Sequence, residues 1–324
     1  MATSPSSPKD CQIVQIMEEE YYLKETGKPI RLEDHQRRIL NAAFTPVNGK
    51  FPYRTIIYSA IKKSGKTEIG AGISYAFARL YGGQMYSIAN DQEQAAGRMW
   101  QRVQETLEVM KEHRPRLYEK IIHEDYAEKI FKGRTIRFAD RGQLNPGPHT
   151  LEYIPNDYRG EAGGMQALTI YDELWAYASE KSNRLWTEMQ PVPTLPISMR
   201  LVTTYAGFYG ESHLLYSIYE ALVDPDPHTE EPRGQRVPGL EDLPVFHKGS
   251  YFCYWDHEAR MPWHSPEFLE EARVDPSLNG REQEYERIWR NRWITGLDAF
   301  LPIAVINQRM AEGEALGLKN HLAV

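Results

Sequence analysis

The chain is poor in cysteine, in long hydrophobic runs and in excess positive charge. Its 324 residues include two cysteines, Cys11 and Cys253. Two thiols are too few for a disulfide framework or a cysteine-based zinc site, and they indicate a reducing compartment such as the cytoplasm. The sequence has no apolar stretch long enough to span a membrane and no signal-peptide pattern, so we expect no membrane contact.

The net charge of −7 argues against a surface coated in basic side chains that bind nucleic acid. Local basic loops, or binding that depends on an assembled ring, are compatible with it. Hydrophobic residues make up 41% and charged residues 26% of the chain, which is typical of a globular protein. Because 324 residues exceed the usual size of a single core, we expect one large domain with a smaller subdomain.

The most informative motif is a phosphate-binding loop pattern at residues 60–67, a small residue, four of any type, then Gly-Lys-Thr. An apolar run that favours a strand precedes it (54–59), and a run that favours a helix follows it. A strand that ends in a tight turn and opens a helix directs several backbone N–H groups, and the positive end of the helix dipole, at one anion. The loop consists of Ala60, Ile61, Lys62, Lys63, Ser64, Gly65, Lys66 and Thr67.

Two residues of this loop have specific expected roles in binding ATP. Lys66 would supply a positive charge to the β- and γ-phosphates, and the hydroxyl of Thr67 would ligate Mg²⁺. Ala60 stands where the full consensus has glycine, which makes the pattern less specific. The motif therefore needs support from elsewhere in the chain.

That support comes from the apolar, β-prone run 167–173, which ends in Asp172 and Glu173. Such a run is typical of a buried central strand of a parallel sheet. In a P-loop NTPase the first carboxylate holds Mg²⁺. The second can polarise the attacking water, which favours hydrolysis over transfer to a bound substrate. Taken alone, the pair could instead be a solvated cap of a helix near Leu174, but the upstream loop favours the ATPase interpretation.

A third strand-like run, 197–204, ends in Thr203 and Thr204. Hydroxyls at the tip of a strand beside the carboxylate strand could hydrogen-bond the γ-phosphate or the attacking water. The alternative is that these β-branched residues only pack, before a turn at Gly207. The alternation of strands and helices predicts an α/β fold of the P-loop NTPase (RecA/ASCE-like) class, with a mostly parallel sheet flanked by helices.

We expect three parts along the chain. Residues 1–30 would form a flexible segment and a helix, 31–207 the P-loop ATPase core, and 208–324 a small lid or linker subdomain. The last part contains, in order, a helical run (211–222), a proline-rich loop (224–244), an aromatic strand-like run (246–256) and two helical runs (267–273 and 281–292).

In this order, the motifs resemble the large terminase subunit of tailed bacteriophages, the motor that packages DNA into procapsids. The resemblance runs from about Leu32 to the C-terminus. The residues that carry it are, in order, His35–Leu40 around Gln36, the loop ending in Gly65-Lys66-Thr67, Ile88–Ala95, Tyr158-Arg159-Gly160, Asp172–Trp175, Thr203-Thr204 and Phe252–Trp255.

The resemblance implies roles for three more residues. Gln36 would contact adenine, unless it is simply a polar residue on an amphipathic helix. Lys62 stands where several family members have an arginine that engages the γ-phosphate, and lysine keeps the charge but lacks the planar fork. Arg159 matches the position of an arginine finger that reaches a neighbouring subunit, the alternative being a solvent-facing loop residue.

The resemblance also implies partners, namely double-stranded DNA, the portal protein and the small terminase subunit. The chain would form a homo-oligomeric ring on the procapsid in the host cytoplasm and be mostly monomeric in isolation. Family members usually continue into an RNase H-like nuclease domain. Because this sequence stops shortly after Phe300-Leu301-Pro302, we expect no nuclease activity from it. The alternatives are a P-loop kinase or other nucleotide-dependent enzyme, and an ATP-switched binding module that does not act on DNA.

Overall fold

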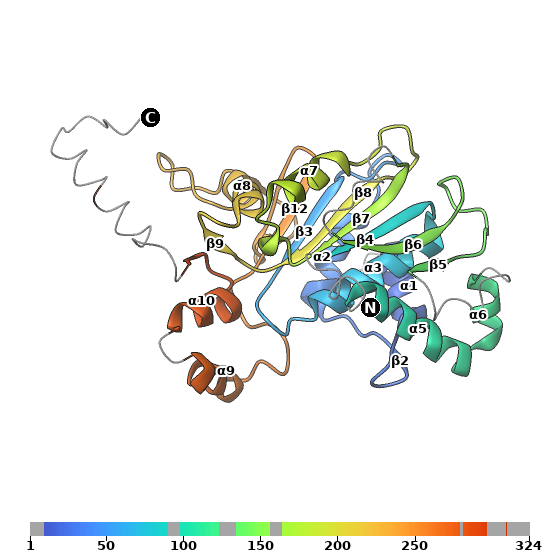
Figure 1. Cartoon of the computed structure of the whole chain (residues 1–324), viewed down its shortest axis with the longest axis horizontal. Coiled ribbons are helices and arrows are strands. Elements are labelled where there is room, and N and C mark those ends of the chain that lie inside the picture. The colour runs from blue at the N-terminus through green and yellow to red at the C-terminus, as the bar shows by residue number, and fades with distance from the viewer. Residues whose placement is uncertain are drawn as a thin grey trace, which may run out of the picture.

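A nine-stranded mixed sheet forms the centre of the computed structural model (Figure 1). The structure describes residues 10–89, 98–122, 134–155, 164–278, 281–296 and 309. The strand order is β10-β11-β12-β3-β8-β7-β4-β6-β5. All neighbours from β12 to β6 pair in parallel, whereas β5 at one edge and β10 and β11 at the other pair antiparallel. The prediction of an α/β fold with a mostly parallel sheet flanked by helices is confirmed.

The strands of the large sheet are β3 (Thr55–Ser59), β4 (Gln84–Ala89), β5 (Thr135–Arg137), β6 (Thr150–Pro155), β7 (Gln166–Asp172), β8 (Met199–Thr204), β10 (Gln235–Arg236), β11 (Val245–Lys248) and β12 (Tyr251–Trp255). Two short pairs complete the strands: β1 (Tyr22–Leu23) with β2 (Lys28–Pro29), and β9 (Phe208–Tyr209) with β13 (Ile294–Thr295). Every residue of β3, β7 and β8 is buried, because helices cover both faces of the sheet at these strands.

The helices are α1 (Gln12–Glu20), α2 (Asp34–Phe44), α3 (Lys66–Leu80), α5 (Met99–His113), α6 (Pro115–Ile121), α7 (Glu180–Glu188), α8 (His213–Leu222), α9 (Pro266–Arg273) and α10 (Glu282–Arg290), with short 3₁₀ helices η2 (Leu174–Ala176) and η3 (Pro276–Leu278). On one face of the sheet, α1, α2, α3 and α5 share a hydrophobic cluster with the strands. On the other face, α7 and α8 pack in a second cluster. Figure 1 shows these two helical layers, with α9 and α10 at the end of the sheet near β9.

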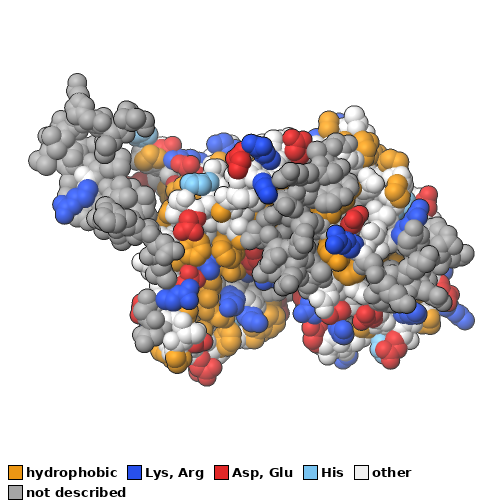
Figure 2. Space-filling model, viewed as in Figure 1, with side chains coloured by type: hydrophobic (Ala, Val, Ile, Leu, Met, Phe, Trp, Pro, Cys, Tyr) orange, Lys and Arg blue, Asp and Glu red, His pale blue; other side chains and the backbone are white. Residues whose placement is uncertain are grey.

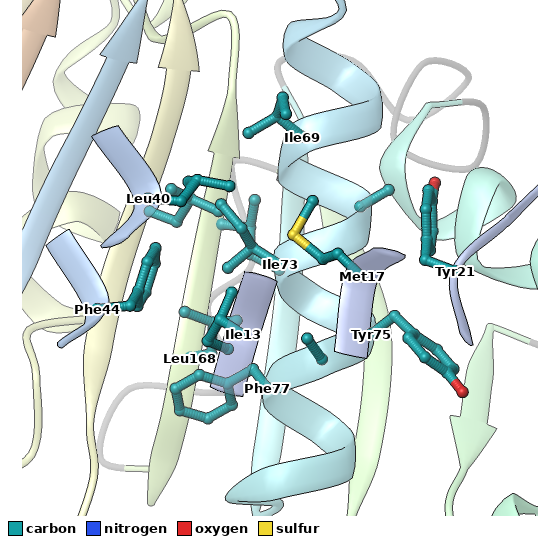
Figure 3. Packing of buried hydrophobic residues seen from close by; sticks show 14 of the residues in the cluster. Ile13, Met17, Tyr21, Leu40, Phe44, Ile69, Ile73, Tyr75, Phe77 and Leu168 are labelled. Atoms are coloured by element: carbon teal, nitrogen blue, oxygen red, sulfur yellow. The ribbon is translucent and has the colours of Figure 1, made fainter. Parts of the chain in front are cut away.

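The larger cluster is centred on α3, which lies between the sheet and α1 (Figure 3). Met17 of α1 and Ile73 and Phe77 of α3 are fully buried there. A β-carbon at Gly72 would lie 2.6 Å from the terminal methyl of Met17, so glycine allows α1 to approach α3 this closely. This packing holds α3, and with it the loop that opens the helix, firmly against the sheet.

The aromatic run 246–256, expected to be strand-like, forms two strands of a hairpin. Strands β11 and β12 pair antiparallel around Gly249, whose φ of +56° lies in the left-handed region. The strand-like character is confirmed, and the turn at Gly249-Ser250 divides the run in two, since a glycine in such a run is a turn signal. The hairpin then places β12 parallel to β3.

Residues beyond Gly207 contribute β10, β11 and β12 to the same sheet as the loop-bearing strand β3. The division into a core and a lid or linker subdomain stays a prediction. Among the helices of the described residues, none combines the length and apolar character that crossing a bilayer requires. Basic and acidic side chains are interspersed over the described part of the face in Figure 2.

Candidate functional site

The loop 60–65 connects β3 to α3, as the sequence predicts. Lys63 and Gly65 adopt left-handed conformations, with φ of 66° and 73°, and Gly65 is the N-cap of α3. Alternation of left- and right-handed residues turns successive backbone N–H groups toward one point, and the first N–H groups of a helix have no partner within the helix. The backbone here therefore has the form of an anion-binding site at a helix N-terminus.

Lys66, the first residue of α3, is buried with its ammonium against this loop. Its ammonium donates hydrogen bonds to the carbonyl oxygens of Ala60 and Ile61, both at 3.0 Å, and lies 5.0 Å from the ring centroid of Tyr205. Burial lowers the pKa of Lys66, and the nearby carboxylates of Glu173 and Asp172 partly offset this effect. A cation is thus held inside the loop, close to two carboxylates.

Asp172 ends β7, directly beside Thr203 on the neighbouring strand β8. The Thr203 hydroxyl donates to one Asp172 oxygen at 2.9 Å. The other oxygen is buried without a hydrogen-bond partner among the described residues, and the guanidinium of Arg98 lies 3.8 Å from it. Burial raises the pKa of Asp172, while the Thr203 hydroxyl and Arg98 lower it in part. A buried carboxylate oxygen without a hydrogen-bond partner is a suitable ligand for a hard cation, so Asp172 fits a Mg²⁺ site.

Glu173 follows with φ 56° and ψ 55°, a left-handed conformation that is unusual for glutamate. Its backbone N–H donates to the carbonyl of Thr203 at 2.7 Å, and its carboxylate accepts from the indole N–H of Trp175 at 2.8 Å. Burial raises the pKa of Glu173 to about 7, although the Lys66 ammonium lowers it. A carboxyl group that titrates near neutral pH can act as a general base.

The loop and Glu173 border one cleft with a volume of about 770 Å³, in the size range of ligand pockets. From the predicted site it is lined by Lys62, Lys63, Ser64, Gly65, Lys66, Thr67 and Glu173. Its other lining residues, which the sequence interpretation missed, are Glu68, Arg98, Arg102, Tyr205, Trp263 and Phe268. Asp172 lies beneath the cleft in contact with Arg98.

Arg98 could have been found from the sequence. It begins the helix that follows β4, and β4 pairs with the carboxylate strand β7. Segments that follow parallel strands meet at the carboxyl edge of a sheet, so a basic residue there is a candidate for an anion site. Trp263, in contrast, carried no local signal, because its contact with the loop joins residues 200 positions apart.

Gln36 is buried beside the loop, where its amide N–H₂ lies 3.5 Å from the carbonyl of Ser64. Its side-chain oxygen accepts from the backbone N–H of Glu33 and completes the capping box of α2. Lys62 is exposed, with its ammonium 5.8 Å from the ring centroid of Trp289. The proposed contacts of Gln36 with adenine and of Lys62 with the γ-phosphate stay predictions.

The two threonines differ in their surroundings. Thr203 donates to Asp172, whereas the Thr204 hydroxyl donates to the carbonyl of Tyr205 at 3.0 Å and accepts from the backbone N–H of Trp175 at 3.4 Å. Both hydroxyls therefore hydrogen-bond to residues of the segment 172–175, Thr203 to the Asp172 side chain and Thr204 to the Trp175 backbone. Arg159 lies outside the described residues.

Within the described residues, no group of three or more His, Cys, Asp or Glu side chains could hold a metal ion. Mg²⁺ in phosphate sites needs only one or two protein ligands, because substrate oxygens and water complete its shell. Thr67, which lines the cleft, and Asp172 could supply such ligands.

Comparison with known proteins gives structural relatives only. No family model matches the chain, and no curated protein matches it. Among solved structures, the crystal structure of the HK97 bacteriophage large terminase matches with a TM-score of 0.56 over 91% of this chain, at 16% identity. The chain has a large-terminase fold. It spans 57% of the length of that protein.

The large terminase ATPase domain of Thermus phage P74-26 is a further match. One crystal structure of this domain gives 16% identity over 82% of this chain and 100% of that chain, with a TM-score of 0.45. Because this score is lower, we base the fold assignment on the HK97 protein. At these identities the likeness concerns the fold, and the chemistry must be argued from this chain's own site.

Proposed function

We propose that this chain is the ATP-hydrolysing motor of viral DNA packaging and translocates double-stranded DNA into a procapsid. The observation that carries the proposal is the shared cleft, where the Lys66 loop at the end of β3 faces Glu173 at the end of β7. Strand β8 lies between these two strands, and Glu173 directly follows Asp172. Both features support assignment to the RecA/ASCE-like class of P-loop NTPases.

The loop backbone and Lys66 would bind the β- and γ-phosphates of ATP, with Gln36 toward the adenine side of the loop. Thr67 and Asp172 would hold Mg²⁺, which supplies neutralisation of the phosphate charge when bound. Thr203 orients the Asp172 carboxylate through its 2.9 Å hydrogen bond. Glu173 would accept the proton of the attacking water, which its pKa of about 7 allows at neutral pH.

Arg159 would complete the active site of a neighbouring subunit and link turnover to assembly. We propose the portal protein and the small terminase subunit as further partners, and a ring on the procapsid in the host cytoplasm as the working state. The large-terminase fold supports these partners. Because this chain spans 57% of the length of the HK97 protein, the partners of a whole large terminase are a proposal for it.

Steady-state phosphate release from Mg·ATP, measured with and without duplex DNA and across protein concentrations, tests the proposal. Lys66→Ala should lose turnover and bind nucleotide about 10- to 100-fold more weakly, because the loop loses a charged hydrogen-bond donor to phosphate. Lys24→Ala is a matched control, since Lys24 is an exposed lysine that pairs with Glu108 at 3.5 Å and with the buried Glu105 at 3.6 Å.

Full turnover in a folded Lys66→Ala protein would contradict the proposal. A phosphorylated small-molecule acceptor, detected in place of free phosphate, would instead show a kinase. Nucleotide binding with neither turnover nor stimulation by DNA would leave an ATP-switched binding module.

A further inference from the structure

Glu173 has a left-handed backbone conformation that is unfavourable for glutamate, so contacts with neighbouring residues must stabilise it. The left-handed φ of 56° comes directly after the buried strand β7, and the hydrogen bond from its N–H to Thr203 anchors this backbone to β8. The carboxylate is then directed to the indole of Trp175, two residues further on, whose N–H donates to it at 2.8 Å. The direction of the proposed general base therefore depends on this indole.

Trp175 is itself held from several sides. Its backbone N–H donates to the Thr204 hydroxyl at 3.4 Å, and its carbonyl accepts from the Ser212 hydroxyl at 2.7 Å. The indole stacks on Tyr205, with ring centroids 5.8 Å apart and an interplanar angle of 29°. Because the ring centroid of Tyr205 also lies 5.0 Å from the Lys66 ammonium, the aromatic pair connects Lys66 with the Glu173 carboxylate.

The guanidinium of Arg287 lies 4.4 Å from the ring centroid of Trp175. Arg287 is on α10 and is buried, as is its ion-pair partner Glu284, at an N–O distance of 2.8 Å. Arg287 also lies 4.5 Å from the ring centroid of Phe208. A cation over an indole attracts the ring through its quadrupole, and the attraction is stronger when water is excluded.

The same helix contacts the phosphate-binding loop. The carbonyl of Ile288, next to Arg287, accepts from the backbone N–H of Lys62 at 2.7 Å. A displacement of α10 would thus act at two places, on the loop through Ile288 and on the indole through Arg287.

We propose that Trp175 is a positioning residue for Glu173 and that Arg287 couples the orientation of its indole to the position of α10. When α10 has its observed position, the indole N–H of Trp175 orients the Glu173 carboxylate. When α10 moves, Arg287 releases the indole and the carboxylate loses its donor. This inference rests on the proposed ATPase function and deepens it, because it assigns a control of the hydrolytic step to residues of the C-terminal segment.

Trp175→Phe is the decisive variant, since it removes the N–H donor and keeps an aromatic ring in contact with Tyr205 and Arg287. We expect kcat to fall about tenfold or more, because a hydrogen bond to a charged group at the reacting centre is lost. The dissociation constant for Mg²⁺ with a non-hydrolysable ATP analogue, measured by calorimetry, should stay within about twofold, because the indole does not line the cleft. Trp293→Phe is the matched control, because the indole N–H of Trp293 has no hydrogen-bond partner among the described residues.

The coupling to α10 is tested by removing the ion pair as a unit, with Arg287→Met and Glu284→Gln together, so that no buried charge is left unpaired. This pair of substitutions should also lower kcat with nucleotide affinity retained. Combined with Trp175→Phe it should add little, because all three changes act through one contact with Glu173. Urea unfolding of each variant shows whether the fold is intact.

Wild-type kcat in Trp175→Phe, equal to that of the Trp293→Phe control, overturns the inference and leaves the proposed function standing. Additive losses in the combined variant overturn the role of Arg287. A wild-type chain without turnover overturns both the function and the inference. A loss of kcat with unchanged affinity, together with non-additivity, supports the inference.

Discussion

Asn291→Ala should destabilise the protein strongly, because one buried side chain joins three segments at the carboxyl edge of the sheet. Asn291 follows α10, is fully buried, and accepts from the backbone N–H of Ala206 at 2.6 Å. Its amide donates to the Ser59 hydroxyl and to the carbonyl of Asp256, both at 2.9 Å. These partners come from the ends of β3 and β12 and from the segment after β8.

The size of the effect follows from these contacts. Leaving the Ala206 N–H buried without a partner costs about 1–3 kcal/mol, and each of the other lost bonds costs about 1 kcal/mol. Asn291 has φ 51°, and alanine in this left-handed conformation costs about 1 kcal/mol more than asparagine. Allowing for water that replaces part of the lost bonding, the free energy of unfolding should fall by about 3–5 kcal/mol.

Urea unfolding of the wild type, Asn291→Ala and Asn291→Gly measures this loss. Glycine loses the same hydrogen bonds but adopts φ 51° without strain, so Asn291→Gly should be the more stable variant by about 1 kcal/mol. If Asn291→Ala loses less than about 1 kcal/mol, the tie between the three segments contributes little and the reasoning is refuted. Equal stability of the alanine and glycine variants would refute the part that concerns the backbone.

Three further predictions concern the proposed chemistry. Glu173→Ala should retain Mg·ATP binding while phosphate release falls about 10²–10⁴-fold. Asp172→Asn should instead weaken the Mg²⁺-dependent part of nucleotide binding. Equal loss of binding in both variants would contradict the assignment of Asp172 to the metal and Glu173 to the water. Glu173 acts as a base only when it is deprotonated, and burial raises its pKa to about 7. The value of kcat/KM should therefore rise with pH through about 7 and level off above it. A flat profile between pH 6 and 8 would count against Glu173 as the base. Specific activity should rise with protein concentration and lose this rise in Arg159→Ala, and mixing with Glu173→Ala should restore some activity; a mixture that stays inactive would place Arg159 outside the neighbour's site.

The parts of the site that the sequence predicted are those that local chemistry determines. The loop before α3 follows from a β-prone run, a glycine at a left-handed position and a helix that opens with Lys66 and Thr67. The neighbouring strands β7 and β8 follow from apolar runs that end in polar residues, and their pairing places Thr203 beside Asp172.

The parts that the sequence did not predict depend on contacts between distant segments. No local pattern indicates that β8 lies between β3 and β7, since strand order is set by packing across the whole sheet. Trp175 belongs to a sequence motif, but its hydrogen bond with Glu173 depends on the left-handed turn at the end of β7 and has no local signal. The contact of Arg287 with Trp175 depends on how α10 returns to the sheet.

The short antiparallel strands at both edges of the sheet bear on how copies of this chain could meet. Within the described part of the chain, β10 has two residues and β5 has three. Long exposed edge strands invite another chain to continue a sheet, and very short ones offer few free backbone groups for this. Subunits of the ring proposed above would therefore meet through loops and side chains. In the proposed ATPase cycle, contacts of this kind could break and re-form while the hydrogen bonds of the sheet stay intact.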